Sequence, residues 1–70
     1  MRYLIIIEET TTGYSAYSPD LPGCVSTGET REELEQNMRE AIQFHIKKLE
    51  LEGYEILQPS TSSVYIEVAA

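Results

Sequence analysis

The chain has 70 residues and a formal net charge of −7, and because such acidity repels phosphate backbones we expect no direct nucleic-acid binding. Its single cysteine excludes an internal disulfide and is typical of a reducing compartment, so we expect a cytoplasmic protein. No apolar run approaches the roughly 20 residues of a membrane span, and no membrane association is expected. A domain this small buries little surface, which favours a homo-oligomer, a dimer or higher.

The N-terminal half is predicted to form three strands. Residues 2–9 are apolar and β-branched, and apolar side chains fall on both faces, as expected for a strand covered on both sides. The turn 10–13 connects this strand to a second one over residues 14–18, which predicts a hairpin. Two prolines and an aspartate fix the loop 19–23, because proline cannot donate to a strand ladder. A short third strand follows over residues 24–27.

The clearest predicted element is a helix that begins after Thr30. Thr30 and Glu33 form a Thr-x-x-Glu capping box, and Gly53 is a suitable stop. Between them one apolar stripe recurs at helical spacing and predicts a helix of roughly 22 residues with one buried face. The members of this stripe are Leu34, Met38, Ala41, Ile42, His45, Ile46 and Leu49. A loop then leads to a last predicted strand, Val64 to Val68.

This order of elements predicts a single α+β domain over residues 1–70. The expected topology is β-β-β-α-β, an antiparallel-rich sheet with one long helix on one face. The opposite face of the sheet keeps apolar side chains from the first strand. An uncovered apolar face of this kind is typical of a protein interface.

The sequence predicts no catalytic residue, no cofactor and no metal, and so no enzyme. Cys24 and His45 are the only soft or borderline ligands, and they are not spaced as a metal site. His45 lies in the apolar stripe, where packing is favoured over a pH-sensitive contact. Cys24 has no cation nearby in sequence, so we expect a buried thiol and not a reactive one.

Two features point to a partner-binding surface. Tyrosines gather near the predicted hairpin, and tyrosine is enriched at protein interfaces, although packing at a sheet edge explains them equally well. The proline loop is stiff and loses little entropy on binding, although a rigid connection between strands is the simpler interpretation. From exposure and rigidity we predict these partner-binding residues: Tyr14, Tyr17, Pro19, Asp20, Leu21 and Pro22.

The run Tyr17-Ser-Pro-Asp-Leu-Pro-Gly-Cys24, followed by Gly28-Glu-Thr30, the helix, and Gly53-Tyr-Glu-Ile56, resembles the HicB antitoxin family over nearly the whole chain. The resemblance implies a partly degraded ribonuclease-H-like fold. It also implies an antitoxin that binds and sterically blocks a HicA-type toxin, a small basic protein that cleaves messenger RNA. The acidity of the chain independently suits a basic partner.

Other interpretations remain open at this stage. Many HicB proteins carry a C-terminal DNA-binding domain, and we expect this chain to represent a short form without one. The alternative function is a solitary HicB-like oligomeric module that binds another protein or serves as a scaffold, without a toxin partner. A residual nuclease built on Glu8, Glu9 and Asp20 is the least favoured, because a fold does not carry its function with it.

Overall fold

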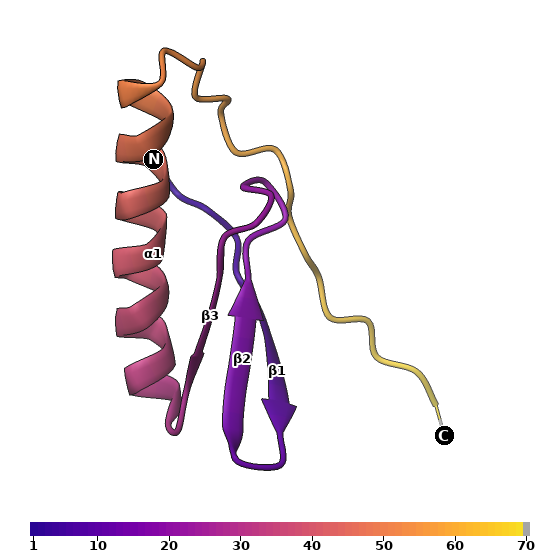
Figure 1. The fold of residues 1–70 in the computed structure, drawn as a ribbon. Helices are drawn as coiled ribbons and strands as arrows, with labels where there is room; N and C mark the ends of the chain where they lie inside the picture. Colours follow the sequence, from indigo (N-terminus) through magenta and orange to yellow (C-terminus); the bar gives the residue numbers. More distant parts are fainter. Residues whose placement is uncertain (70) are drawn as a thin grey trace.

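Three antiparallel strands and one helix form the body of the molecule in a computed structural model, which describes residues 1–69. Strand β1 spans Ile6–Thr10, β2 spans Gly13–Tyr17, β3 spans Val25–Gly28, and helix α1 spans Arg31–Leu51. The strand order is β1-β2-β3, and α1 lies across one face of the sheet (Figure 1). The predicted α+β class and the order of its first four elements are confirmed.

Cross-strand pairing sorts the side chains of the sheet onto two faces. Ile7 lies opposite Ala16 on the face toward α1, where Ala16 is buried and Ile7 packs against the core. The neighbouring row joins Ile6, Tyr17 and Val25 and points the other way, since successive residues of a strand alternate between faces. Tyr17 and Val25 are 42% and 64% exposed. The sheet therefore presents an apolar row on its uncovered face.

Both ends of α1 lie close to where the sequence places them. The Thr30 hydroxyl oxygen accepts a hydrogen bond from the backbone N–H of Glu33 over 3.1 Å, as the capping box predicts. After the last turn, Gly53 adopts a left-handed φ of 77°. The N–H of Tyr54 then donates to the carbonyl of Leu49 over 2.9 Å and ends the helix.

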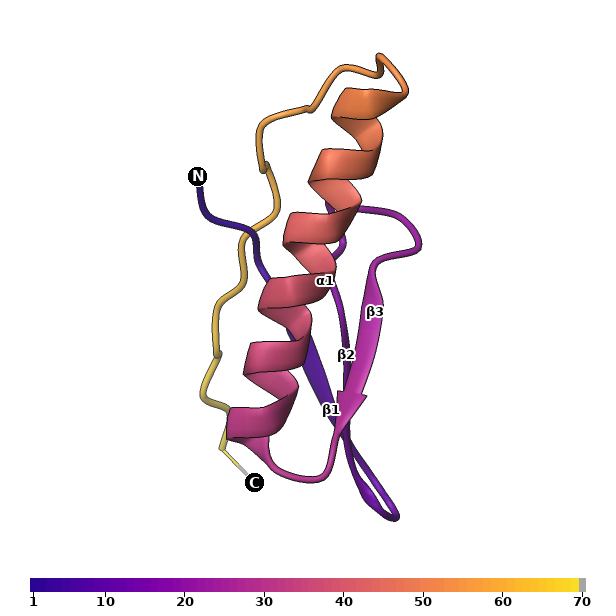
Figure 2. The same ribbon diagram turned by 60° about the vertical axis from the view of Figure 1, so that its left-hand side comes forward.

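The core lies between the first half of α1 and the sheet. Leu34 and Met38 are completely buried, and Ala41 and Ile42 pack against the same cluster. The second half of α1 extends beyond the ends of the strands, beside the loop that connects β2 to β3 (Figure 2). This position explains why later members of the stripe, including His45, are only half-buried. The buried residues of the core are Ala16, Leu21, Cys24, Leu34 and Met38.

The last predicted strand does not form within residues 1–69. Residues 64–68, here called the C-terminal segment, belong to no strand, and Val64 and Ile66 are 80% and 77% exposed. The segment is yellow in Figure 1 and runs in the same direction as β1, on the side away from β2. Alternation of side chains predicts a strand, but pairing also needs a neighbour with free N–H and C=O groups, which the alternation does not identify. The predicted fifth element is thus not formed in this chain.

Candidate functional site: a partner-binding surface

The loop between β2 and β3 consists of two consecutive hydrogen-bonded turns. The N–H of Leu21 donates to the carbonyl of Ser18, and the N–H of Cys24 donates to the carbonyl of Leu21. A third bond, from the N–H of Ser18 to the carbonyl of Cys24, closes the loop at 3.2 Å. Pro22 and Gly23, with φ 84° at the glycine, occupy the central positions of the second turn, as in a type II turn. Two prolines and these three bonds hold the loop in one shape.

The structure separates the predicted partner-binding residues into exposed and supporting ones. Tyr17, Pro19 and Pro22 are exposed at the loop end of the sheet. Leu21 is only 4% exposed, because the double turn directs its side chain into the core, where it anchors the loop. Tyr14 lies elsewhere, half-buried at the hairpin end of β2 and on the face toward α1. These six residues therefore do not form one continuous patch.

Asp20 connects the loop to the chain that follows α1. Its Oδ1 atom accepts hydrogen bonds from the hydroxyls of Thr61 and Ser60 over 2.9 and 3.3 Å. Its Oδ2 atom accepts a bond from the backbone N–H of Thr61 over 3.3 Å. Hydrogen bonding by Thr61 lowers the pKa of the Asp20 carboxyl, with a smaller lowering contribution from Ser60 and a partial opposing effect of desolvation. Asp20 is thus engaged within its own chain in this structure.

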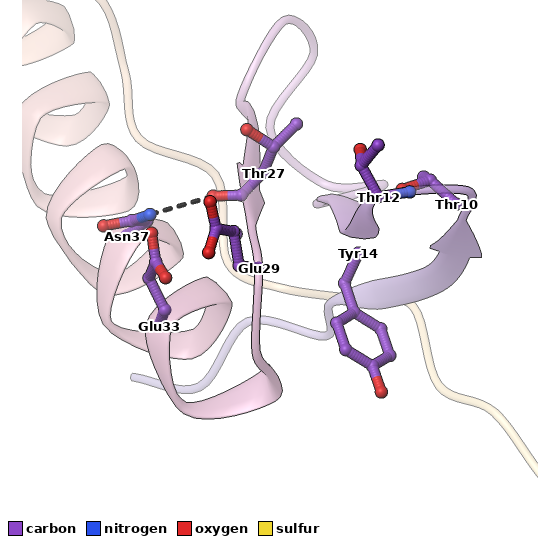
Figure 3. A pocket seen from close by; sticks show the side chains of 8 residues that line it. Thr10, Thr12, Tyr14, Thr27, Glu29, Glu33 and Asn37 are labelled. Carbon is purple, nitrogen blue, oxygen red and sulfur yellow. Dashed lines mark hydrogen bonds between the residues drawn. The ribbon is translucent and has the colours of Figure 1, made fainter.

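A polar hollow of about 410 Å³ lies at the hairpin end of the molecule, between the strands and the start of α1 (Figure 3). The carboxylates of Glu29 and Glu33 border it beside Tyr14. The amide of Asn37 donates to the carbonyl of Thr27 over 2.8 Å and fixes the wall between α1 and β3. The complete lining is Thr10, Thr12, Tyr14, Thr27, Gly28, Glu29, Glu33 and Asn37. Sequence reasoning missed this hollow, because its walls come from all three strands and α1, which meet only in the fold.

The groups most suited to chemistry are not arranged for it within residues 1–69. Cys24 is buried, as predicted, and burial raises the pKa of its thiol. His45 borders the same groove as Cys24, a proximity that sequence spacing did not reveal, but no hydrogen bond joins the two side chains. Glu9 and Asp20 lie at opposite ends of β2, and no three acidic, histidine or cysteine side chains gather as metal ligands in the described chain.

The described residues include no helix that is long and apolar enough to cross a membrane. What they present to a partner is a set of surfaces. These are the proline loop, residues 19–23, with Tyr17 beside it, the apolar row of Ile6, Tyr17 and Val25 on the uncovered face, and the polar hollow at the hairpin end. Such an arrangement supports binding, since each surface displays exposed side chains from a rigid element.

Comparison with known proteins gives similar chains of various lengths. A UPF0150 protein of Helicobacter pylori is 38% identical over 65 residues, which cover 91% of this chain and 90% of that protein. An uncharacterized 14.9 kDa protein from the rep-hol intergenic region of Haemophilus phage HP1 is 39% identical over 66 residues, 94% of this chain. The chain spans only half the length of that phage protein.

The comparison extends to a solved structure and to a family. A chain from the structure of the HicA3 and HicB3 toxin-antitoxin complex superposes with a TM-score of 0.74 at 35% sequence identity. The match covers 86% of this chain and 70% of that one. The family described as HicB_like antitoxin of bacterial toxin-antitoxin system matches residues 3–69, almost the entire sequence. The chain therefore belongs to the HicB-like antitoxins of bacterial toxin-antitoxin systems.

Proposed function

We propose that this chain binds a basic HicA-type toxin and sterically blocks the surface with which the toxin cleaves RNA. The observation that carries this proposal is the match over 86% of the chain to a structure of a HicA3 and HicB3 complex. The antitoxin contributes binding and no chemistry of its own, consistent with the buried Cys24 thiol and the distance between its candidate carboxylates. This role belongs in the cytoplasm, where messenger RNA is translated.

The charge of the chain supports a basic partner. The formal net charge is −7, and Glu29 and Glu33 face the same hollow at the hairpin end. A negative surface attracts a basic protein over a distance and raises the association rate, an effect that salt weakens. We therefore propose that the association rate with the toxin falls as ionic strength rises. The same charge disfavours direct binding of nucleic acid.

The exposed residues at the loop end are the proposed docking surface. Tyr17 lies between Ile6 and Val25 on the uncovered face, next to the loop that carries Pro19 and Pro22. An aromatic side chain within a rigid apolar surface is often a hot spot, a residue that contributes a large share of the binding free energy of an interface. Leu21 and Asp20 then hold the loop in place and do not contact the partner. Tyr14 contributes a separate contact beside the polar hollow.

Co-expression with the basic protein encoded beside this chain's gene tests the proposal. The wild-type chain should restore growth, co-purify with the toxin and stop RNA cleavage by the purified toxin. Tyr17→Asp should weaken the complex by about 2 kcal/mol, a roughly thirtyfold loss of affinity. Gln58→Asp makes the same charge change at an exposed residue outside the proposed surface and should leave affinity within about threefold.

The result that overturns the proposal is a well-folded wild-type chain that neither binds nor inhibits the neighbouring toxin. A solitary scaffold module would then be the better description. Equal affinities of Tyr17→Asp and Gln58→Asp would retain the antitoxin role and remove the uncovered face as its docking surface. Circular dichroism of each variant establishes that a lost interaction does not reflect a lost fold.

A further inference from the structure

β3 is the outer strand of the sheet, and part of its free edge lacks a partner. The N–H of Ser18 donates to the carbonyl of Cys24, so these residues form a hydrogen-bonded pair between the end of β2 and the start of β3. Because such pairs alternate with unbonded ones, the N–H and C=O groups of Val25 point away from β2. Thr27 points the same way, and its carbonyl accepts a bond from the Asn37 amide on α1 over 2.8 Å. The edge is therefore bonded to α1 at Thr27 and open at Val25.

A groove borders this open part of the edge. β3 and the proline loop lie beside the second half of α1 (Figure 2), and the groove between them has a volume of about 450 Å³. Two of its lining residues, Phe44 and Val25, are 74% and 64% exposed. Within residues 1–69 the backbone of Val25 forms no hydrogen bond. Unpaired backbone groups beside exposed apolar side chains are a template for pairing with a further strand.

The charge of this groove is opposite to that of the chain as a whole. The chain has 12 aspartate and glutamate residues against five lysine and arginine residues. Among the described residues, however, His45 and Lys48 line the groove and no aspartate or glutamate does. The side chain of Lys48 is exposed, and that of His45 is half-buried. The groove therefore favours a carboxylate over the cations of a basic partner.

We propose that this groove binds an extended, acidic peptide segment of a partner protein, which adds to the free edge of β3 as a fourth strand. The N–H and C=O groups of Val25 bond to the peptide backbone, as in other cases of strand addition. Successive peptide side chains then alternate between the uncovered face, beside Val25, and the groove. In the groove, an apolar side chain meets Phe44 and a carboxylate meets Lys48. This binding is additional to that of the proposed basic toxin and does not depend on it.

The amide of Asn37 limits where such a peptide can lie. It already occupies the carbonyl of Thr27, so an added strand pairs at Val25 and extends toward the proline loop. Along α1, the same direction leads toward the end of the helix, from Phe44 to Lys48 (Figure 2). The apolar part of the peptide is thus expected near the middle of the groove and its acidic part at the loop end.

Three synthetic peptides test the charge preference. Each is blocked at both ends and has the core Val-Thr-Val-Thr-Val, flanked on both sides by two glutamates, two glutamines or two lysines. By isothermal titration calorimetry at physiological salt, the glutamate peptide should bind roughly tenfold more tightly than the glutamine peptide, and the lysine peptide least tightly. Lys48→Glu should reverse the order of the glutamate and lysine peptides. Lys47→Glu makes the same charge change at an exposed neighbour outside the groove lining and should preserve the order.

Methylation of the peptide backbone tests the added strand. Adjacent amides of a strand point in opposite directions, so N-methylation of one central amide of the glutamate peptide should abolish binding, and methylation of its neighbour should not. Phe44→Ala should weaken binding by roughly tenfold, whereas Gln43→Ala, an exposed residue outside the lining, should not change it. Circular dichroism of each variant establishes that the fold is intact.

Three results would each overturn the proposal. The first is equal binding of the three peptides, tightest binding of the lysine peptide, or no binding of the glutamate peptide. The second is an equal loss of affinity in the two methylated peptides. The third is a dimer, observed by sedimentation equilibrium, that Phe44→Ala dissociates, since a second copy would then fill the groove. None of these results concerns the toxin, whose binding Tyr17→Asp tests separately.

Discussion

The hydroxyl of Thr61 donates a hydrogen bond to Oδ1 of Asp20 over 2.9 Å, although the two residues lie 41 positions apart in the chain. Asp20 belongs to the proline loop, and Thr61 belongs to the extended chain after α1. This contact determines where the C-terminal segment leaves the body. It also makes that position depend on the ionisation of one carboxyl group.

Replacement of Asp20 by alanine should release the chain around Thr61. The expected result is faster amide hydrogen exchange at Thr61, since its N–H donates to Asp20, with little change in α1. Thr61→Val should produce part of the same effect, and the two substitutions should not be additive because they remove one shared contact. Additive effects in this double-mutant cycle would show that the two residues are energetically independent.

Acidification should loosen the same contact. Hydrogen bonds lower the pKa of Asp20 in the folded chain, so their stabilisation is complete above the ordinary aspartate pKa of about 3.9. It is lost as the pH falls through the lower, folded pKa. An NMR titration of the Asp20 carboxyl and the Thr61 amide should report one common midpoint below that of an exposed aspartate. A midpoint at or above the ordinary value would contradict this assignment.

Truncation of Leu34 should unfold a large fraction of the molecule. Leu34 is completely buried at the centre of a small core, and Leu→Ala at such a site costs about 2–5 kcal/mol. That loss is comparable with the total stability expected for a domain of this size. Urea denaturation measures it, with Phe44→Ala on the same helix as the control, since Phe44 is 74% exposed. A loss below about 0.5 kcal/mol, as expected for Phe44→Ala, would mean that the core does not depend on Leu34.

Removal of the helix cap should reduce the stability of the fold less than truncation of Leu34 does. Thr30→Ala deletes the oxygen that accepts from the N–H of Glu33 and should reduce the free energy of unfolding by about 1 kcal/mol. Thr30→Ser retains an accepting hydroxyl and should restore most of that loss. Thr12→Ala, in the exposed hairpin turn, is the matched control. Equal stabilities of Thr30→Ala and Thr12→Ala in thermal denaturation would exclude a capping role.

Two glycines should respond differently to the same substitution. A Cβ atom at Gly28 would lie 2.6 Å from the backbone nitrogen of Leu34, so Gly28→Ala must push α1 away from β3 and should cost about 1–3 kcal/mol. Gly53 has open space around it and is required only for its positive φ. Asparagine should therefore be tolerated at Gly53 and not at Gly28. Equal stability of the two asparagine variants would refute this distinction.

Local signals in the sequence were sufficient to predict most of the secondary-structure elements of the fold. The capping box at Thr30 marks the start of α1, the spacing of Leu34 and Met38 identifies its buried face, and Gly13 ends the hairpin turn. Each of these signals acts between residues a few positions apart. The predicted homo-oligomer and the partner-binding role of individual residues stay predictions.

The remaining features depend on contacts between distant residues. The sequence predicts that Leu21 lies in an exposed loop, but the double turn buries its side chain. The backbone hydrogen bonds between Ser18, Leu21 and Cys24 that cause this burial are visible only in the structure. The contact between Asp20 and Thr61 has no sequence signal, because neither residue type requires the other. The alternation at Val64–Val68 predicted a strand that the described chain does not form, because alternation does not identify the neighbour that a strand needs.

Glu67 has a consequence for how this protein behaves when concentrated. It carries the only charge in a short exposed segment of high strand propensity, and such segments promote aggregation when nothing interrupts them. A charged residue within an apolar run acts as a gatekeeper against that process. The resistance of this segment to aggregation in a concentrated solution therefore depends on one carboxylate.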